Sequence, residues 1–321
     1  MALPSSGIIS ISDILTEGGV TGSPTAGLQG LANGDFFNIN TDSAGYPSGA
    51  APFAMSEWYG YNQNAFPPTS LYYWLGDGVN DTLRFTNNSS TLFNSNDDFS
   101  YSGWYRIDET FNDTQFLATF AQATPSGNNM IFVMYQATSA RMMLRFRYGG
   151  GGNFHQRFWS LYSTNNAPIS GITSAGWKSN TRGNVNSEGF VHLVFTRDNS
   201  NTASSGMNCY WNGQKLPESI QFNSRSLTGF DIKSAAIGDA ISSSPNNALV
   251  FKGGIDQVSV YDKVLTQSEV SALYNNGVPA TGSDAGVTSN LLAEYRLENN
   301  TTNSSGNFPS LVNTGGTFQQ Y

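Results

Sequence analysis

The stretch from Gly253 to Gly277, GGIDQVSVYDKVLTQSEVSALYNNG, combines a strand pattern with a helix pattern and indicates the fold class. Apolar and polar residues alternate from Ile255 to Tyr261, as they do in a strand with one buried face. The segment from Thr266 to Glu269 is a capping box, and the apolar stripe that follows it ends at Gly277. This stretch predicts a strand followed by one short helix whose apolar stripe lies on a sheet.

Short runs of the same alternating kind fill the chain from Leu71 to about Gly277, separated by turns rich in Gly and Asn. Residues 211 to 214, WNGQ, predict a hairpin, because Asn and Gly tolerate the positive φ that both central residues of a type I′ turn require. The pattern predicts an all-β fold, an antiparallel β-sandwich of the jelly-roll type. Its clearest runs are Thr82–Phe85, Phe99–Ile107, Phe116–Ala121, Met130–Tyr135, Met142–Tyr148, Phe190–Thr196 and Ile255–Tyr261.

Composition excludes several classes of protein. Only 12% of the 321 residues are charged, and the net charge of −8 argues against binding to a nucleic acid backbone. The single cysteine, Cys209, cannot form an intrachain disulfide, and two histidines cannot complete a structural zinc site with it. No apolar run approaches the ~20 residues of a membrane helix, so we expect no membrane insertion.

We predict three regions: an N-terminal module at residues 1–66, a jelly-roll domain at 67–282, and a C-terminal strand and tail at 283–321. In the first, Ser10 caps a short helix with Asp13 at its third position, and Ser56 caps a second one. Both helices are too short to be stable alone and need a tertiary or subunit partner. In the last, the strand starting at Leu291 precedes either a loose tail or a strap across a neighbouring subunit.

Two stretches resemble the laminin-G-like, concanavalin A-like jelly-roll family. WLGDGVNDTLRF, which begins at Trp74, and the following DFSYSGWYRI look like that family's opening strands, and the stretch from Gly253 to Gly277 is similar to its closing strand and helix. GFVHLVFTRD and CYWNGQKL resemble its paired central strands, with Phe190 standing in for the aromatic residue that precedes the strand histidine. The resemblance departs from the family at residues 149–186, which look like a longer loop.

The N-terminal region separately resembles the leader of bacteriophage virion proteins. The matching motifs are ALPSSG at Ala2–Gly7, the helix at Ile11–Leu15 and MSEWYG at Met55–Gly60. LLAEYRLENN, which begins at Leu291, looks like a segment that trails such jelly rolls. Together these resemblances imply a virion structural protein that carries a lectin-like domain.

Catalytic motifs are missing from the sequence. The paired carboxylates that glucanases of this fold place on one strand do not occur as a Glu-x-Asp-x-x-Glu run, so we expect no enzyme. His192 lies in an alternating strand, where a structural role is favoured over that of a catalytic base. His155 falls in the predicted long loop, where a ligand contact has no supporting partner residue.

A glycan site requires exposed aromatic side chains, because sugar C–H faces stack on rings while polar side chains bind hydroxyls. Trp74 and Trp104 lie inside strand patterns and are predicted to be core residues. The candidates for glycan contact therefore come from the long irregular region, with packing between subunits as the alternative. These candidates are Trp159, Tyr162, Trp177 and Arg182.

The family resemblance also implies a calcium site. Asp77, Asn80 and Asp81 share one turn, and Asp256 is the acidic residue of the closing strand, so their oxygens are candidate ligands. The alternative is turn chemistry, in which Asp and Asn side chains bond neighbouring backbone amides. We favour turn chemistry and predict no cofactor, with Ca²⁺ left as the alternative.

These observations predict a structural component of a phage particle, either tail-associated, as in a tail fibre, or a head decoration protein. Residues 1–66 would dock it to other virion proteins, and the lectin-like domain would bind a host-surface glycan or neighbouring subunits in host attachment. We expect a homo-oligomer located in the virion and made in the host cytoplasm, since the N-terminus lacks the basic region of a signal peptide. The alternatives are a cement protein without a ligand and a polysaccharide-degrading enzyme.

Overall fold

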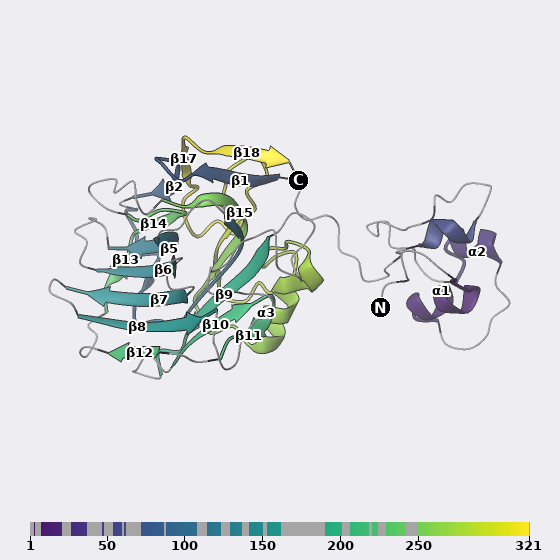
Figure 1. Cartoon of the computed structure of the whole chain (residues 1–321), viewed down its shortest axis with the longest axis horizontal. Coiled ribbons are helices and arrows are strands. Elements are labelled where there is room, and N and C mark those ends of the chain that lie inside the picture. The colour runs from purple at the N-terminus through teal and green to yellow at the C-terminus, as the bar shows by residue number, and fades with distance from the viewer. Residues whose placement is uncertain are drawn as a thin grey trace. The chain divides into compact units, whose positions relative to one another are not determined.

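The structure is a computed structural model of the chain, which divides into two compact units, Met1–Thr69 and Ser70–Tyr321 (Figure 1). Each unit is described by itself below. The described residues are 3, 8–20, 27–36, 47, 54–59, 61, 72–86, 88–107, 114–122, 129–136, 141–149, 153–161, 190–200, 206–217, 220–223, 229–241 and 250–320.

The N-terminal unit contains the helices α1 (Ile11–Glu17), α2 (Leu28–Ala32) and η1 (Met55–Trp58). The predicted start of α1 is confirmed, because Ser10 Oγ accepts from the Asp13 N–H and the Asp13 carboxylate accepts from the Ser10 N–H. The prediction that Ser56 caps the second helix was wrong, because Ala54 occupies the N-cap position of η1. Helix α2 was not predicted, and it has no side-chain cap that could mark its start in the sequence.

The three N-terminal helices share one apolar cluster within their own unit. A backbone hydrogen bond of 2.8 Å from the Leu3 N–H to the Tyr61 carbonyl joins the two ends of the unit. The partner that these short helices require is therefore tertiary. The buried members of the cluster are Leu3, Ile9, Ile14, Leu15, Leu31, Ala32, Trp58 and Tyr61.

The second unit is a sandwich of two antiparallel sheets, as predicted (Figure 1). Sheet A has the strand order β11-β10-β9-β4-β15-β1-β18, and β16 pairs with β15. Its strands are β1 (Tyr72–Asp77), β4 (Phe99–Ile107), β9 (Val191–Arg197), β10 (Met207–Trp211), β11 (Gln214–Lys215), β15 (Lys252–Tyr261), β16 (Leu291–Tyr295) and β18 (Thr317–Gln320).

Sheet B has the strand order β12-β8-β7-β6-β5-β14-β2-β17, and a separate two-stranded sheet pairs β13 (Asp231–Ile232) with β3 (Phe93–Asn94). The strands of sheet B are β2 (Thr82–Phe85), β5 (Thr114–Ala121), β6 (Met130–Gln136), β7 (Arg141–Tyr148), β8 (Asn153–Ser160), β12 (Ile220–Asn223), β14 (Ser234–Ile237) and β17 (Val312–Thr314).

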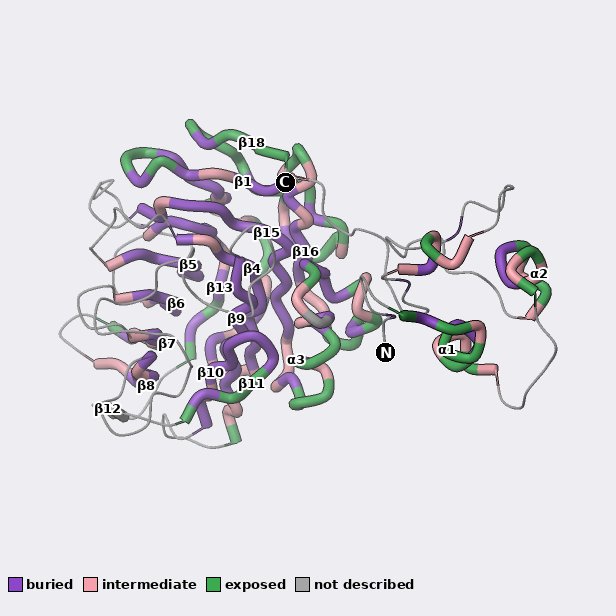
Figure 2. Tube along the Cα trace, turned by 45° about the vertical axis from the view of Figure 1, so that its right-hand side comes forward, coloured by how far each residue is buried: buried purple, intermediate pink, exposed green. Residues whose placement is uncertain are grey.

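The largest core cluster lies between the two sheets, and the strands are mostly buried (Figure 2). Aromatic rings meet edge to face there: the Phe99 and Phe120 ring centroids are 5.5 Å apart, and those of Tyr101 and Phe120 are 5.9 Å apart. Trp74 belongs to this cluster. Trp104 is also fully buried, as predicted, but it packs with Tyr73 and Phe190 in a separate cluster.

The predicted hairpin and helix are confirmed. Asn212 and Gly213, with φ values of 47° and 78°, connect β10 to β11. Helix α3 (Gln267–Tyr274) begins at its capping box, and its buried residues pack with side chains from strands of sheet A. The helix ends three residues earlier than predicted, because Asn275 adopts the left-handed conformation at φ 44°. No helix in the described ranges has the length and hydropathy to cross a membrane.

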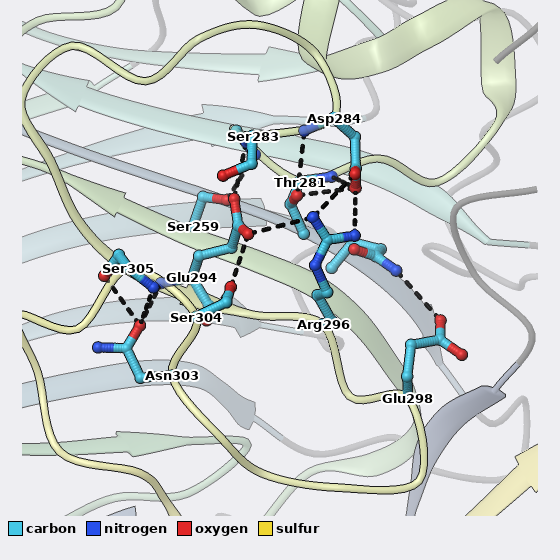
Figure 3. A network of polar contacts seen from close by, with 12 residues as sticks. Ser259, Thr281, Ser283, Asp284, Glu294, Arg296, Glu298, Asn303, Ser304 and Ser305 are labelled. Carbon is cyan, nitrogen blue, oxygen red and sulfur yellow. Dashed lines mark hydrogen bonds and ion pairs between the residues drawn. The ribbon is translucent and has the colours of Figure 1, made fainter. Parts of the chain in front are cut away.

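The C-terminal residues belong to the sandwich and extend both of its sheets. β16 pairs with β15, β17 with β2 and β18 with β1, so this region is neither a loose tail nor a strap across another subunit. A polar network holds the segment (Figure 3): the Glu294 carboxylate accepts from the Ser283 N–H at 2.7 Å and from Ser304 Oγ at 2.6 Å. Arg296 adds an ion pair with Asp284 at 2.8 Å.

Candidate functional site

We call the face of sheet B that points away from the core the outer face of sheet B. It carries a second apolar cluster. Strand alternation produces it: along β6, Ile131 and Val133 join the core while Met130, Phe132 and Met134 point to the other side. The cluster comprises Phe116, Ala121, Met130, Phe132, Met134, Met143, Phe158, Ala236 and Ile241.

Strand β7 places three arginines on the same face. Arg141, Arg145 and Arg147 alternate with buried core residues of the strand and are themselves half-buried. Register with β8 sets Arg145 beside Gln156 and Arg147 beside Phe154. The outer face of sheet B therefore combines buried apolar side chains with half-buried, positively charged groups.

Ring and amide contacts hold two of these guanidinium groups in place. Arg145 Nε donates to Gln156 Oε1 at 2.6 Å, and its guanidinium carbon lies 5.1 Å from the centroid of the Phe154 ring. The Arg141 guanidinium carbon lies 5.8 Å from the centroid of the Phe158 ring. Such contacts orient a guanidinium group while leaving its outer N–H donors for another partner.

One row of side chains runs across five strands of this face. Cross-strand pairing aligns Arg145 on β7, Phe132 on β6, Thr119 on β5, Ala236 on β14 and Arg84 on β2. At a spacing of about 4.8 Å between strands, the Cα atoms of the two arginines lie roughly 19 Å apart.

A carboxylate lies beside the Arg84 end of this row. The Asp239 carboxylate is 3.8 Å from the Arg84 guanidinium, and the Asp239 carbonyl accepts from Thr119 Oγ1 at 2.9 Å. The pKa of Asp239 is raised to about 6, mainly by burial of the carboxylate. A backbone hydrogen bond and the charge of Arg84 act in the opposite direction, but their combined effect is smaller. Asp239 is therefore ionised at neutral pH and protonated in mild acid.

The predicted glycan residues lie elsewhere. Trp159 is in strand β8, not in a loop, and its side chain is fully buried in the core between the sheets, so the expectation that it is exposed was wrong. Strand alternation explains the difference, since Trp159 follows the outward Phe158. Tyr162, Trp177 and Arg182 lie outside the described residues.

The structure does not gather the predicted calcium ligands. Asp77 Oδ1 accepts from the Val79 N–H at 2.7 Å and Asp81 Oδ2 from the Asp77 N–H at 2.8 Å, so both carboxylates are engaged in turn chemistry. Asp256 lies four residues along β15 from Lys252, the partner of Asp77, or about 13 Å away. Within the described ranges, no three His, Cys, Asp or Glu residues form a group that could hold a metal ion.

Both histidines are buried in strands. His192 Nε2 lies 2.9 Å from Ser102 Oγ, and burial lowers the pKa of His192 to about 3. This confirms the structural role predicted for His192. His155 lies in β8, not in a loop, and its side chain is buried.

Sequence reasoning missed the residues of the outer face of sheet B. The signal was present in RMMLRFRY at Arg141–Tyr148, where three arginines occupy one side of an alternating strand. Alternation reveals two faces but not which face meets the other sheet, and arginine on a surface strand is unremarkable in isolation. Strand β8 was missed because its sequence follows the glycine run at 149–152.

Comparison with known protein families gives one match. The sequence profile described as the concanavalin A-like lectin/glucanases superfamily matches residues 77–271. This range contains strands from both sheets, including all of β5 to β8. No curated protein sequence matches the chain.

Solved structures of similar architecture share little sequence with this chain. A Bacteroides ovatus protein provisionally assigned to carbohydrate binding has a TM-score of 0.49 and 14% identity; the match covers 80% of this chain and spans 61% of the length of that protein. A heptameric pentraxin from Limulus polyphemus has a TM-score of 0.47 and 12% identity, with 80% and 97% coverage. The CBM40 module of a Ruminococcus gnavus sialidase, bound to α2,3-sialyllactose, has a TM-score of 0.39 and 15% identity. That match covers 56% of this chain and 83% of the module.

Proposed function

The chain belongs to the concanavalin A-like lectin/glucanases superfamily, and from this premise we propose that it is a carbohydrate-binding protein whose site is the outer face of sheet B. The observation that carries the proposal is the half-buried ring of Phe154 against the half-buried guanidinium of Arg145, with two further half-buried arginines of β7 on the same face of one sheet. Lectin sites require this combination, because rings stack on sugar C–H groups and planar donors bind hydroxyls.

The individual contacts support a sugar ligand. Phe154 is half-buried and lies under the Arg145 guanidinium, so the two groups form a platform with an apolar and a polar part. Gln156 is buried, and its amide oxygen fixes the guanidinium by accepting from Arg145 Nε. A sugar bound beside this pair would meet an apolar group and guanidinium donors for its hydroxyls.

A glycan array with the full chain tests the proposal. We expect binding to at least one glycan, and we expect Phe154→Ala to weaken it at least tenfold, which corresponds to about 1.4 kcal/mol. Leu75→Ala is the matched control, because Leu75 is also partly buried but packs with the Trp104 cluster, away from this face. The proposal fails if no glycan binds, or if F154A and L75A have equal effects.

The proposed role is binding without bond cleavage. The described strands of sheet B contain no Asp or Glu, so they cannot supply the two carboxylates that a glycosidase places about 5 to 10 Å apart. Release of reducing ends from a host polysaccharide would contradict this role and favour the enzyme.

For the N-terminal unit we propose attachment to a larger assembly, with the phage virion as its location and homo-oligomers as the assembled form. Its support is the motif resemblance of Ala2–Gly7 and Met55–Gly60. Mass spectrometry of purified phage particles tests the location. If the chain occurs in particles yet binds no glycan, the cement protein becomes the better explanation.

A further inference from the structure

We propose that the sugar bound on the outer face of sheet B is anionic and carries a carboxylate or a sulfate ester. This inference rests on the proposed function and names the ligand class of the same site.

Positive charge is concentrated on sheet B of an acidic protein. The whole chain has 15 Lys and Arg residues against 23 Asp and Glu, yet the strands of sheet B contain five arginines and no acidic residue. Arg157 points inward, where its Nη1 donates to the Met207 carbonyl at 2.9 Å. The remaining four arginines lie on the outer face: Arg84, Arg141, Arg145 and Arg147.

The three arginines of β7 lack carboxylate partners. None of the ion pairs among the described residues includes Arg141, Arg145 or Arg147. By contrast, Arg296 is paired with Asp284 at 2.8 Å, and Arg84 lies 3.8 Å from Asp239. Arg84 and Arg296 therefore lie near carboxylates, while none of the ion pairs in the described part of the chain includes an arginine of β7.

This arrangement is unfavourable for the free protein. Arg145 and Arg147 are two residues apart on one side of a strand, so their Cα atoms are separated by about 7 Å. Burial lowers the pKa of Arg145, and repulsion from Arg147 lowers it further. An anion between these groups would relieve the repulsion, so its binding is favoured by an interaction that the free protein lacks.

The guanidinium of Arg145 is oriented for such an anion. Its Nε is occupied by Gln156 at 2.6 Å and its face lies over the Phe154 ring, so the Nη donors remain for a ligand. Carboxylate and sulfate oxygens accept two parallel N–H bonds from one guanidinium, which is a stronger contact than a neutral hydroxyl makes. An acidic sugar would place its anion on the arginines and its ring beside the half-buried Phe154.

The net charge of the chain selects against dense polyanions. At low salt the net charge of −8 repels a nucleic acid or a heavily sulfated chain at long range. At physiological salt this repulsion is screened beyond about 8 Å, and the local field of the arginines remains. The ligand best matched to this field is a glycan with isolated acidic residues.

Titration of the full chain with surfaces that carry glucuronic acid, galactose 6-sulfate or galactose tests the inference. We expect at least tenfold tighter binding of one or both charged sugars than of galactose, and a loss of this preference in Arg145→Gln and Arg147→Gln. Binding of glucuronic acid alone identifies a carboxylate ligand, and binding of galactose 6-sulfate alone identifies a sulfate ester. Affinity for the charged sugar should also fall with rising salt concentration.

Arg106→Gln is the matched control, because it removes the same charge from sheet A, where Arg106 lies over the Tyr73 ring. If R145Q lowers the unfolding temperature, R147Q decides the outcome, since none of the described contacts involves its guanidinium. Equal binding of charged and neutral sugars, unchanged by either variant, overturns the anionic ligand and leaves carbohydrate binding intact. If no glycan on a full array binds the protein, the proposed function itself is overturned.

Discussion

Acid should destabilise this protein through His192. The side chain is buried beside the rings of Trp104 and Tyr274, at centroid distances of 5.1 and 6.2 Å, and its Nε2 is 2.9 Å from Ser102 Oγ. Burial lowers the pKa of His192 to about 3 from its ordinary value of 6.5. Between pH 6.5 and about pH 3, His192 is protonated in the unfolded chain but neutral in the folded chain. The free energy of unfolding therefore decreases as the pH falls through this range.

The size of the effect follows from the two pKa values. Between pH 7 and pH 4.5 the unfolded state gains nearly one proton more than the folded state, which costs the folded state about 2.5 kcal/mol at about 1.4 kcal/mol per pH unit. His192→Gln keeps a polar group near Ser102 but cannot be protonated. We expect the stability gap between the wild type and H192Q to narrow by this amount on acidification.

Guanidinium unfolding of both proteins at pH 7 and pH 4.5 measures the gap. Asp239 acts in the opposite direction, because its raised pKa of about 6 means that the folded state gains a proton first and is stabilised as the pH falls. Both proteins contain Asp239, so its contribution cancels in the comparison. Ser102→Ala is the control, since it removes the hydrogen bond but leaves His192 buried. A gap between wild type and H192Q that is equal at both pH values refutes the reasoning.

Three further predictions concern caps, the core and metal binding. Thr266→Ala removes the side chain that accepts from the Glu269 N–H and should cost about 1 kcal/mol in thermal unfolding; no change would show that the cap is dispensable. Trp159→Ala empties a fully buried position and should cost about 3 to 5 kcal/mol, whereas an unaltered unfolding temperature would contradict its core placement. EDTA should leave the unfolding temperature unchanged, because Asp77 and Asp81 already accept backbone N–H groups; stabilisation by added Ca²⁺ would restore the calcium site.

Features encoded by neighbouring residues could be predicted from the sequence. The alternation of Thr82–Phe85 and Phe99–Ile107 reproduces the bounds of β2 and β4. The Asn-Gly turn and the capping boxes that begin at Ser10 and Thr266 also occur as expected. These features depend on backbone conformations and hydrogen bonds within a few residues, so the local sequence contains the information that they require.

The candidate site could not be predicted in the same way. Trp159 and Phe158 are adjacent aromatic residues of one strand, yet the first is in the core and the second belongs to the outer face of sheet B. The sequence says only that they point in opposite directions. Which direction leads outward depends on where the other sheet lies, and that sheet is built from strands distant in the chain.

What the sequence alone determined is therefore the strand character of the chain, its turns and its helix starts. The tertiary structure decided that residues from Leu291 onward join both sheets, that Glu294 is enclosed by Ser283 and Ser304, and that the arginines of β7 share a surface with Phe154. The physical reason is that local propensity acts over a few residues, whereas the choice of a strand's partner and of its buried face is a property of the whole sandwich.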